Sequence, residues 1–125
     1  MSRLEFAYDT AYDPPAPVVE IWVEGVVGAR ERCRALVDPS ATVPCVPSRI
    51  LDVIRAPDTG EVKMTTFLGD TGCLRKRKVT VLLGTKQAKL EVLPLARDVA
   101  LLGRDFLNGC VVVLDGRAQK VCVED

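Results

Sequence analysis

The chain has 125 residues, enough for one ordinary folded domain. Hydrophobic residues make up 48% of it and charged residues 27%, which supports a buried core with a solvated surface and excludes a disordered tail. Seventeen basic residues balance seventeen acidic ones, so no net field draws the chain to nucleic acid or an anionic membrane. Because histidine is absent, Ser-His-Asp and Cys-His nucleophile systems are excluded.

The cysteines are spread along the chain without a C-x-x-C pair, at Cys33, Cys45, Cys73, Cys110 and Cys122. Zinc and iron–sulfur sites usually take ligands in close pairs, so we expect no metal and no cofactor. The first 13 residues lack the apolar stretch of a signal peptide, and no run is long enough to span a membrane. These features predict reduced thiols in a cytoplasmic protein without a membrane partner.

We expect residues 1–17 to form an extended proline-rich leader, and residues 18–125 to form a single domain. The leader ends in Asp13-Pro14-Pro15-Ala16-Pro17, where proline fixes φ and removes backbone donors. Alternating apolar and polar residues then predict strands over Val18–Glu24 and Glu31–Val37.

The second of these strands ends in apolar residues and therefore delivers Asp38 to the core. Pro39-Ser40-Ala41 breaks the strand, and a short apolar piece follows. Pro47-Ser48 then predicts a helical turn over Arg49–Ile54, because proline suits the start of a helix. An aspartate before Pro-Ser is also typical of a simple turn or capping residue, the plainer interpretation of Asp38.

A β-hairpin is predicted between Val62–Leu68 and Cys73–Leu83, joined by Gly69-Asp70-Thr71-Gly72. Its second arm contains Arg75-Lys76-Arg77-Lys78. Since successive strand side chains face opposite ways, both faces there should be solvated, and the hairpin should project beyond the core as a flap would. RNA contact by this basic run is the alternative, but the neutral net charge and the lack of interleaved aromatics favour no nucleic-acid partner.

The C-terminal third predicts strands over Lys86–Leu93, Val99–Leu102 and Gln119–Val123, with a brief helix within Gly103–Gly109. Cys110–Leu114 is continuously apolar, which predicts a strand buried on both faces. Short strands with two short helices, and no alternation of strand and helix, indicate an all-β barrel or sandwich.

Two segments, Ala35–Val43 (ALVDPSATV) and Leu101–Leu107 (LLGRDFL), resemble motifs of the retropepsin-like aspartic proteases. Ala35–Val43 (ALVDPSATV) is similar to the active-site segment of that family, apolar-apolar-Asp-Thr/Ser-Gly-Ala. Leu101–Leu107 (LLGRDFL) is similar to its second motif, apolar-apolar-Gly-Arg-Asp/Asn-x-Leu. The resemblance extends from about Val18 to about Val123 and implies a small closed all-β barrel with one or two short helices and a flap hairpin.

The resemblance also implies an aspartic endopeptidase with Asp38 as the catalytic carboxylate and Pro39, Ser40 and Ala41 as the active-site loop. Two neighbouring carboxylates share one proton and can serve as base and acid toward a water molecule. Because the chain has one such segment, a symmetric homodimer acting on an extended peptide or protein substrate is implied.

Other positions take supporting roles by the same resemblance. Gly69, Asp70, Thr71 and Gly72 would form the substrate-binding tip of the flap. Gly103, Arg104 and Asp105 would support the active-site loop from behind.

The active-site segment departs from the family pattern at three positions. Pro39 has neither the hydroxyl nor the N–H of the usual Thr or Ser, and Ser40 replaces a glycine. Thr42 replaces an aspartate that pairs with the motif arginine in retroviral members, so Arg104 should pair with a main-chain carbonyl or Glu124. These departures make a second hypothesis necessary, a catalytically inactive member that binds a peptide or protein as a dimer.

Asp58-Thr59-Gly60 and Asp70-Thr71-Gly72 also spell the family's Asp-Thr-Gly. Neither follows a buried strand, so we expect both to lie in turns, where aspartate and glycine are common.

Overall fold

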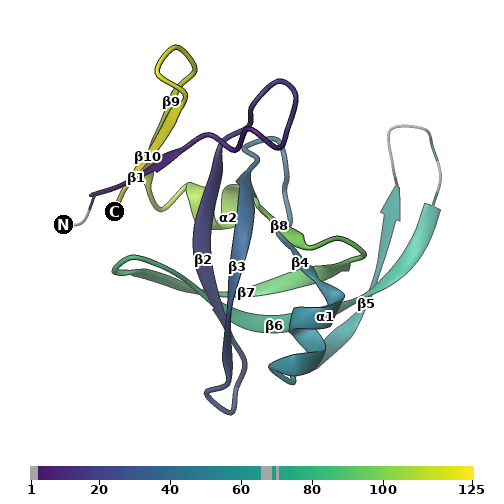
Figure 1. Cartoon of the computed structure of the whole chain (residues 1–125). Helices are drawn as coiled ribbons and strands as arrows, with labels where there is room; N and C mark the ends of the chain where they lie inside the picture. The colour runs from purple at the N-terminus through teal and green to yellow at the C-terminus, as the bar shows by residue number, and fades with distance from the viewer. Residues whose placement is uncertain (1–2, 66–68, 70) are drawn as a thin grey trace.

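The computed structural model describes residues 3–65, 69 and 71–125, and these form ten strands and two short helices (Figure 1). The barrel strands are β2 (Val18–Glu24), β3 (Arg30–Val37), β4 (Cys45–Pro47), β6 (Thr71–Leu83), β7 (Lys86–Leu95) and β8 (Val99–Leu102). The helices are α1 (Ser48–Val53) and α2 (Arg104–Leu107). The remaining strands are β1 (Arg3–Ala7), β5 (Asp58–Thr65), β9 (Val111–Asp115) and β10 (Lys120–Glu124).

The barrel closes because β2 has a partner on each side. It pairs with β3 along its whole length and, through Trp22–Glu24, with Thr80–Leu82 of β6. In the described part of the chain, the order β2-β3-β8-β4-β7-β6 therefore returns to β2 as a closed barrel of six strands. This confirms the predicted all-β barrel.

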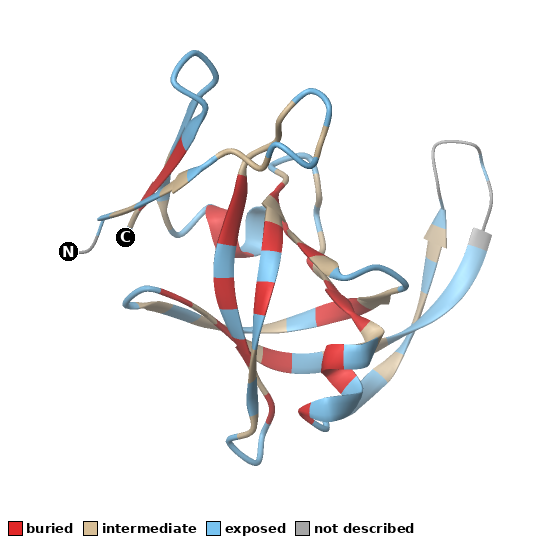
Figure 2. Cartoon of the chain, viewed as in Figure 1, coloured by how far each residue is buried: buried red, intermediate tan, exposed pale blue. Residues whose placement is uncertain are grey.

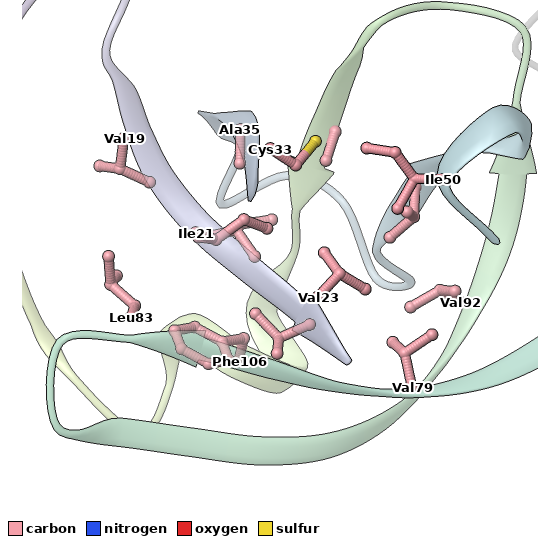
Figure 3. Packing of buried hydrophobic residues seen from close by; sticks show 14 of the residues in the cluster. Val19, Ile21, Val23, Cys33, Ala35, Ile50, Val79, Leu83, Val92 and Phe106 are labelled. Atoms are coloured by element: carbon pink, nitrogen blue, oxygen red, sulfur yellow. The ribbon is translucent and has the colours of Figure 1, made fainter. Parts of the chain in front are cut away.

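Alternation along β2 and β3 builds the core. Val19, Ile21 and Val23 of β2 point inward, whereas Glu20 and Trp22 between them are exposed (Figure 2). Figure 3 shows these side chains packed with Phe106 of α2, which is fully buried. Burying an aliphatic or aromatic side chain of this size contributes about 1.5–3 kcal/mol, so the core rests on the alternation that the sequence displays.

Helix α1 follows β4 at Pro47-Ser48, as predicted, and buries Ile50 and Leu51. Arg77 of β6 holds the end of this helix: its Nε donates to the Ala56 carbonyl (2.6 Å) and an Nη donates to the Leu51 carbonyl (3.1 Å). The Arg77 side chain is only 21% exposed. The prediction that both faces of the basic run are solvated is therefore wrong at this residue, because the run passes beneath α1.

Strand β5 pairs with β6 as the predicted hairpin, which extends to one side of the barrel in Figure 1. None of the residues in β5 is buried, in keeping with a hairpin that projects beyond the core. The first arm of the hairpin, predicted from Val62, begins at Asp58 in the structure. Residues 66–68 and 70 lie outside the described part of the chain.

Asp58-Thr59-Gly60 lies in β5 rather than in the predicted turn. The pairing shifts register between Asp58 and Gly60, and Gly60 has φ of 119°. The Asp58 carboxylate accepts the Gly60 N–H at 2.8 Å. The segment thus has the side-chain to backbone hydrogen bond and the positive φ that are typical of a turn, but they form a bulge inside a strand.

The remaining strands form a small sheet in the order β1-β10-β9. Residues 3–7 of the expected leader thus pair with the C-terminal strand, which the sequence analysis does not predict. The prediction of a strand after Cys110 is right, but its burial on both faces is wrong. Val111, Val113 and Leu114 are 59%, 51% and 45% exposed, because β9 is the edge of this sheet.

Gly25, where the β2–β3 turn begins, provides a test of the packing between this turn and α1. A Cβ at this position would lie 2.1 Å from the Ile54 carbonyl oxygen, and that oxygen belongs to backbone that cannot swing away. We expect Gly25→Ala to lower the free energy of unfolding by about 1–3 kcal/mol, measured by urea denaturation. Gly116→Ala is the control, since a Cβ there meets no described atom within 4 Å; equal stability of the two variants would contradict this packing.

Candidate active site

Asp38 lies at the end of β3, where this strand pairs in parallel with β8. The Asp38 N–H donates to the Leu102 carbonyl at 3.0 Å, and the Val37 N–H donates to the Pro17 carbonyl at 3.0 Å. The half-buried carboxylate is thus presented from a strand end that is held by both neighbouring segments. The sequence analysis predicts that this strand delivers Asp38 to the core, whereas the structure places the residue half-buried just after the end of β3.

The carboxylate of Asp38 is held by its own loop. Its Oδ1 accepts the Ser40 N–H at 3.1 Å and also the Ser40 hydroxyl hydrogen. The Ala41 N–H donates to the Asp38 carbonyl at 3.1 Å and closes the turn. These bonds also make Asp38 the capping residue of the turn. The same geometry is therefore compatible with a purely structural role for Asp38 as a turn residue and with a catalytic role.

Arg104, the first residue of α2, braces this loop. One Nη donates to the carbonyls of Pro39 (3.0 Å) and Ser40 (3.2 Å), and the other donates to the Thr42 hydroxyl (3.0 Å). The Arg104 N–H adds a bond to the Ala41 carbonyl at 2.9 Å. Of the two expected pairings, the main-chain carbonyl is found, whereas Glu124 pairs with Arg3.

Gly103 allows the loop and α2 to approach closely. A Cβ at this position would lie 2.7 Å from the Ala41 carbonyl oxygen, so a side chain here would push the loop away. Asp105 is exposed, and its carboxylate interacts with backbone N–H groups at the start of α2. Desolvation nevertheless raises the pKa of Asp105, and those N–H groups oppose the rise. The structure thus brings Gly103 and Arg104 to the loop.

Cys45 is a neighbour of the site that the sequence analysis does not place there. It is half-buried in β4, opposite Leu101 of β8 and thus one residue from the Asp38 partner Leu102. Burial raises the pKa of the Cys45 thiol, and the negative charge of Asp38 raises it further. Cys45 comes close to Asp38 because β4 pairs with β8 in the antiparallel sense. Predicting strands along a single sequence does not show which strands pair, so it does not place Cys45 at the site.

The predicted flap residues lie at the far end of the β5–β6 hairpin. Gly69 is exposed with φ of 85°, and Gly72 pairs with Met64 in the ladder. Thr71 pairs with Thr65, and Asp70 lies outside the described residues. Figure 1 shows the described strands of this hairpin, β5 and the start of β6, extending away from the loop that follows β3.

Three members of the basic run form ion pairs. Arg75 pairs with Asp58, Lys76 with Glu91 at 2.8 Å, and Arg77 with Asp52 at 3.2 Å. Arg75 lowers the pKa of Asp58, and Lys76 lowers the pKa of Glu91. Much of the positive charge on which RNA contact would depend is therefore balanced within the chain.

No cluster of three or more potential metal-ligating side chains occurs among the described residues. In the same part of the chain, neither helix has the length and apolar character needed to cross a membrane.

The Arg104 brace predicts the effect of a conservative change. Arg104→Lys retains the charge but cannot reach three acceptors in a fixed plane, so the loop should lose order. We expect faster amide hydrogen exchange at Ser40 and Ala41 and a loss of about 1 kcal/mol in unfolding free energy. Arg117→Lys, an exposed arginine of the β9–β10 turn, is the control. Unchanged exchange at both loop amides would show that the brace does not order the loop.

No protein-family model and no curated protein matches this sequence. Solved structures do match. A retropepsin-like aspartic protease from Rickettsia conorii aligns with a TM-score of 0.64 at 13% identity, over 98% of this chain and 90% of that one. The protease of simian foamy virus (mac) aligns with a TM-score of 0.54 at 20% identity, over 72% of this chain and 92% of that one.

A foamy viral protease-reverse transcriptase aligns with a TM-score of 0.55 at 16% identity, over 74% of this chain. The present chain spans only 12% of that longer polypeptide. At 13–20% identity, these three comparisons show a likeness in fold. The chain has the fold of the retropepsin-like aspartic proteases, as its two motifs predict.

Proposed function

We propose that this protein is an aspartic endopeptidase that acts as a homodimer, with one Asp38 from each copy at a shared site. The observation that carries the proposal is the position of Asp38. It ends a buried strand of a retropepsin-like barrel, on a loop that Arg104 braces through the Pro39 and Ser40 carbonyls and the Thr42 hydroxyl. The parts needed to present one carboxylate at a fixed orientation are therefore together.

The chemistry requires two such carboxylates. Two carboxyl groups a few ångströms apart cannot both ionise at low cost, so they hold one proton between them. The ionised member takes a proton from a water molecule, which attacks the peptide carbonyl carbon. The protonated member then gives its proton to the departing nitrogen as the C–N bond breaks. A second copy of the chain supplies the second carboxylate.

Ser40 takes a positioning role in this scheme. Its N–H and hydroxyl both donate to Asp38 Oδ1, which fixes the plane of the carboxylate and leaves Oδ2 to face the water and the partner carboxylate. In the family pattern this position is a glycine without a hydroxyl. Ser40 thus supplies within one chain some of the restraint that Pro39 lacks.

An extended peptide is the substrate that this architecture suits. The β5–β6 hairpin has no buried residue in β5 and would close over the peptide with Gly69, Asp70, Thr71 and Gly72 at its tip. Backbone groups of an extended chain are recognised by strand-like pairing, whatever the side chains are. Cys45 is half-buried and near enough to Asp38 for the aspartate charge to raise the pKa of its thiol, so it would lie beside the bound peptide.

A second candidate, a dimeric peptide- or protein-binding module without turnover, is favoured by Pro39. This residue is exposed and offers the loop only its carbonyl oxygen, which Arg104 already occupies. It cannot make a hydroxyl bond across a dimer, so the two Asp38 loops would be held less rigidly.

Asp38→Asn tests the first candidate. The amide keeps the shape of the carboxylate but cannot accept a proton from water, so peptide-library cleavage at acidic to neutral pH should fall by at least about 100-fold. Asp58→Asn, which alters the other described Asp-Thr-Gly segment, should retain cleavage. Equal activity of Asp38→Asn and the unaltered protein would exclude Asp38 as the catalytic carboxylate.

Ser40 and Pro39 variants separate the two candidates. Ser40→Ala removes the hydroxyl donor and keeps the N–H, so we expect about a tenfold lower kcat with KM unchanged, as for a loss of about 1.4 kcal/mol in the transition state. Ser48→Ala is the control, since its hydroxyl bonds the Leu95 carbonyl away from the site. An inactive unaltered protein that gains cleavage in Pro39→Thr/Ser40→Gly would instead support the binding module.

A further inference from the structure

A crevice lies between β1 of the small sheet and the outer face of the barrel. One part of it, with a volume of about 330 Å³, is lined by Leu4 and Phe6 of β1 and by Trp22 and Leu82 of the barrel. Trp22, the one tryptophan of the chain, is 39% exposed, and the other three side chains are half-buried. A concave apolar site of this size that is still partly open to solvent suits an apolar side chain of a ligand.

Arg32 supplies a positive charge at this apolar hollow. It lies opposite Trp22 in the β2–β3 ladder, and its guanidinium is 5.3 Å from the centre of the Trp22 ring. Within the described residues Arg32 forms no ion pair, whereas Arg30 on the same face pairs with Glu24 at 2.7 Å. Stacking on an aromatic ring orients the planar guanidinium and leaves its N–H groups available, so Arg32 can bind a carboxylate through two parallel hydrogen bonds.

The crevice continues along β1 beyond the apolar hollow. A second hollow, of about 460 Å³, shares Phe6 and Glu20 with the first and follows residues 5–10 of the chain. Together the two hollows follow residues 4–10, a length of roughly 20 Å at the rise of a strand, which suits several residues of an extended chain. Glu20 is exposed and has no hydrogen bond or ion pair in the described part of the chain, so its carboxylate is available to an N–H donor.

The backbone of β1 has an open edge. This strand pairs with β10 on one side, and no other described strand pairs with it. The Tyr8 N–H donates to the Gln119 carbonyl at 2.8 Å, on the β10 side. Because backbone groups alternate in direction along an antiparallel strand, Glu5 and Ala7 direct theirs to the open edge, and both residues line the crevice. An extended peptide can therefore add to β1 as a further strand, which favours a peptide over a small molecule as the occupant.

We propose that this crevice binds the C-terminal end of an extended peptide whose last residue is apolar. Arg32 holds the terminal carboxylate, and the last side chain packs on Trp22 and Leu82. The preceding peptide backbone runs antiparallel to β1 along its open edge, since the apolar hollow lies at the Leu4 end of this strand. Glu20 accepts one N–H of the peptide. Contacts of this kind recognise a backbone, one apolar side chain and a free carboxylate, and they do not specify the rest of the peptide sequence.

The peptide crevice is separate from the candidate active site. Neither hollow is lined by Asp38 or by a residue of its loop. Asp38 follows Arg32 by six residues, which is roughly 20 Å along an extended strand. The proposal therefore does not depend on the proposed function, and binding at the crevice can be measured whether or not the protein cleaves peptides.

The single tryptophan allows a direct test, since all tryptophan fluorescence of the chain originates in this crevice. The unaltered protein is titrated with an acetylated pentapeptide, Ala-Thr-Ala-Thr-Leu, that has a free C-terminal carboxylate. We expect a saturable change in Trp22 emission. The same pentapeptide with a C-terminal amide should bind at least about tenfold more weakly, because it lacks the charge that Arg32 pairs with. Free leucine should also bind at least about tenfold more weakly, because it has no backbone to pair with β1.

Two arginine variants identify the residue that binds the carboxylate. Arg32→Gln should weaken binding of the acid pentapeptide by at least about tenfold and leave the affinity for the amide pentapeptide unchanged. Arg30→Gln is the matched control, since Arg30 also lies over the Trp22 ring, at 5.9 Å, but lines neither hollow. Circular dichroism checks that both variants are folded.

Three results would overturn the proposal: no saturable binding by fluorescence or calorimetry, equal affinity for the acid and amide pentapeptides, or equal effects of the two arginine variants. Free leucine that binds as tightly as the acid pentapeptide would overturn the peptide as the occupant.

Discussion

The guanidinium of Arg104 is the interaction on which the geometry of the candidate site depends. The loop after β3 turns sharply at Pro39, and its carbonyl groups point away from any strand ladder that could pair them. One planar side chain satisfies two of these carbonyls and the Thr42 hydroxyl, while Gly103 leaves room for the Ala41 carbonyl. Because bonds to a charged donor are stronger than neutral ones, a small number of them can order a loop that has little buried apolar surface of its own.

The barrel makes this arrangement possible by joining distant parts of the chain. Parallel pairing of β3 with β8 sets the end of one motif beside the start of the other, although they lie more than sixty residues apart. The pairing of β2 with β6 closes the barrel around one core. Phe106 of α2 is fully buried in that core. The core and the candidate site are thus consequences of the same strand order.

The sequence predicts what depends on local pattern and fails where the answer depends on a remote partner. Alternation along β2 gives its bounds and buried face, and Pro47-Ser48 gives the start of α1. By contrast, the pairing of β1 with β10 and the proximity of Cys45 to Asp38 depend on topology, which periodicity does not encode. The burial predicted for Cys110–Leu114 rests on composition alone, and composition does not show that β9 lies at the edge of its sheet.

The ion pairs at the root of the β5–β6 hairpin have a mechanical consequence. Arg75, Lys76 and Arg77 tie this root to β5, β7 and α1 respectively. The first two pairs are largely in solvent, where added salt screens them, whereas Arg77 also donates to two backbone carbonyls beneath α1. Any bending of the hairpin must therefore start beyond its root. Rising ionic strength weakens the Arg75 and Lys76 ion pairs, whereas the hydrogen bonds of Arg77 to the backbone keep the hairpin attached to the barrel.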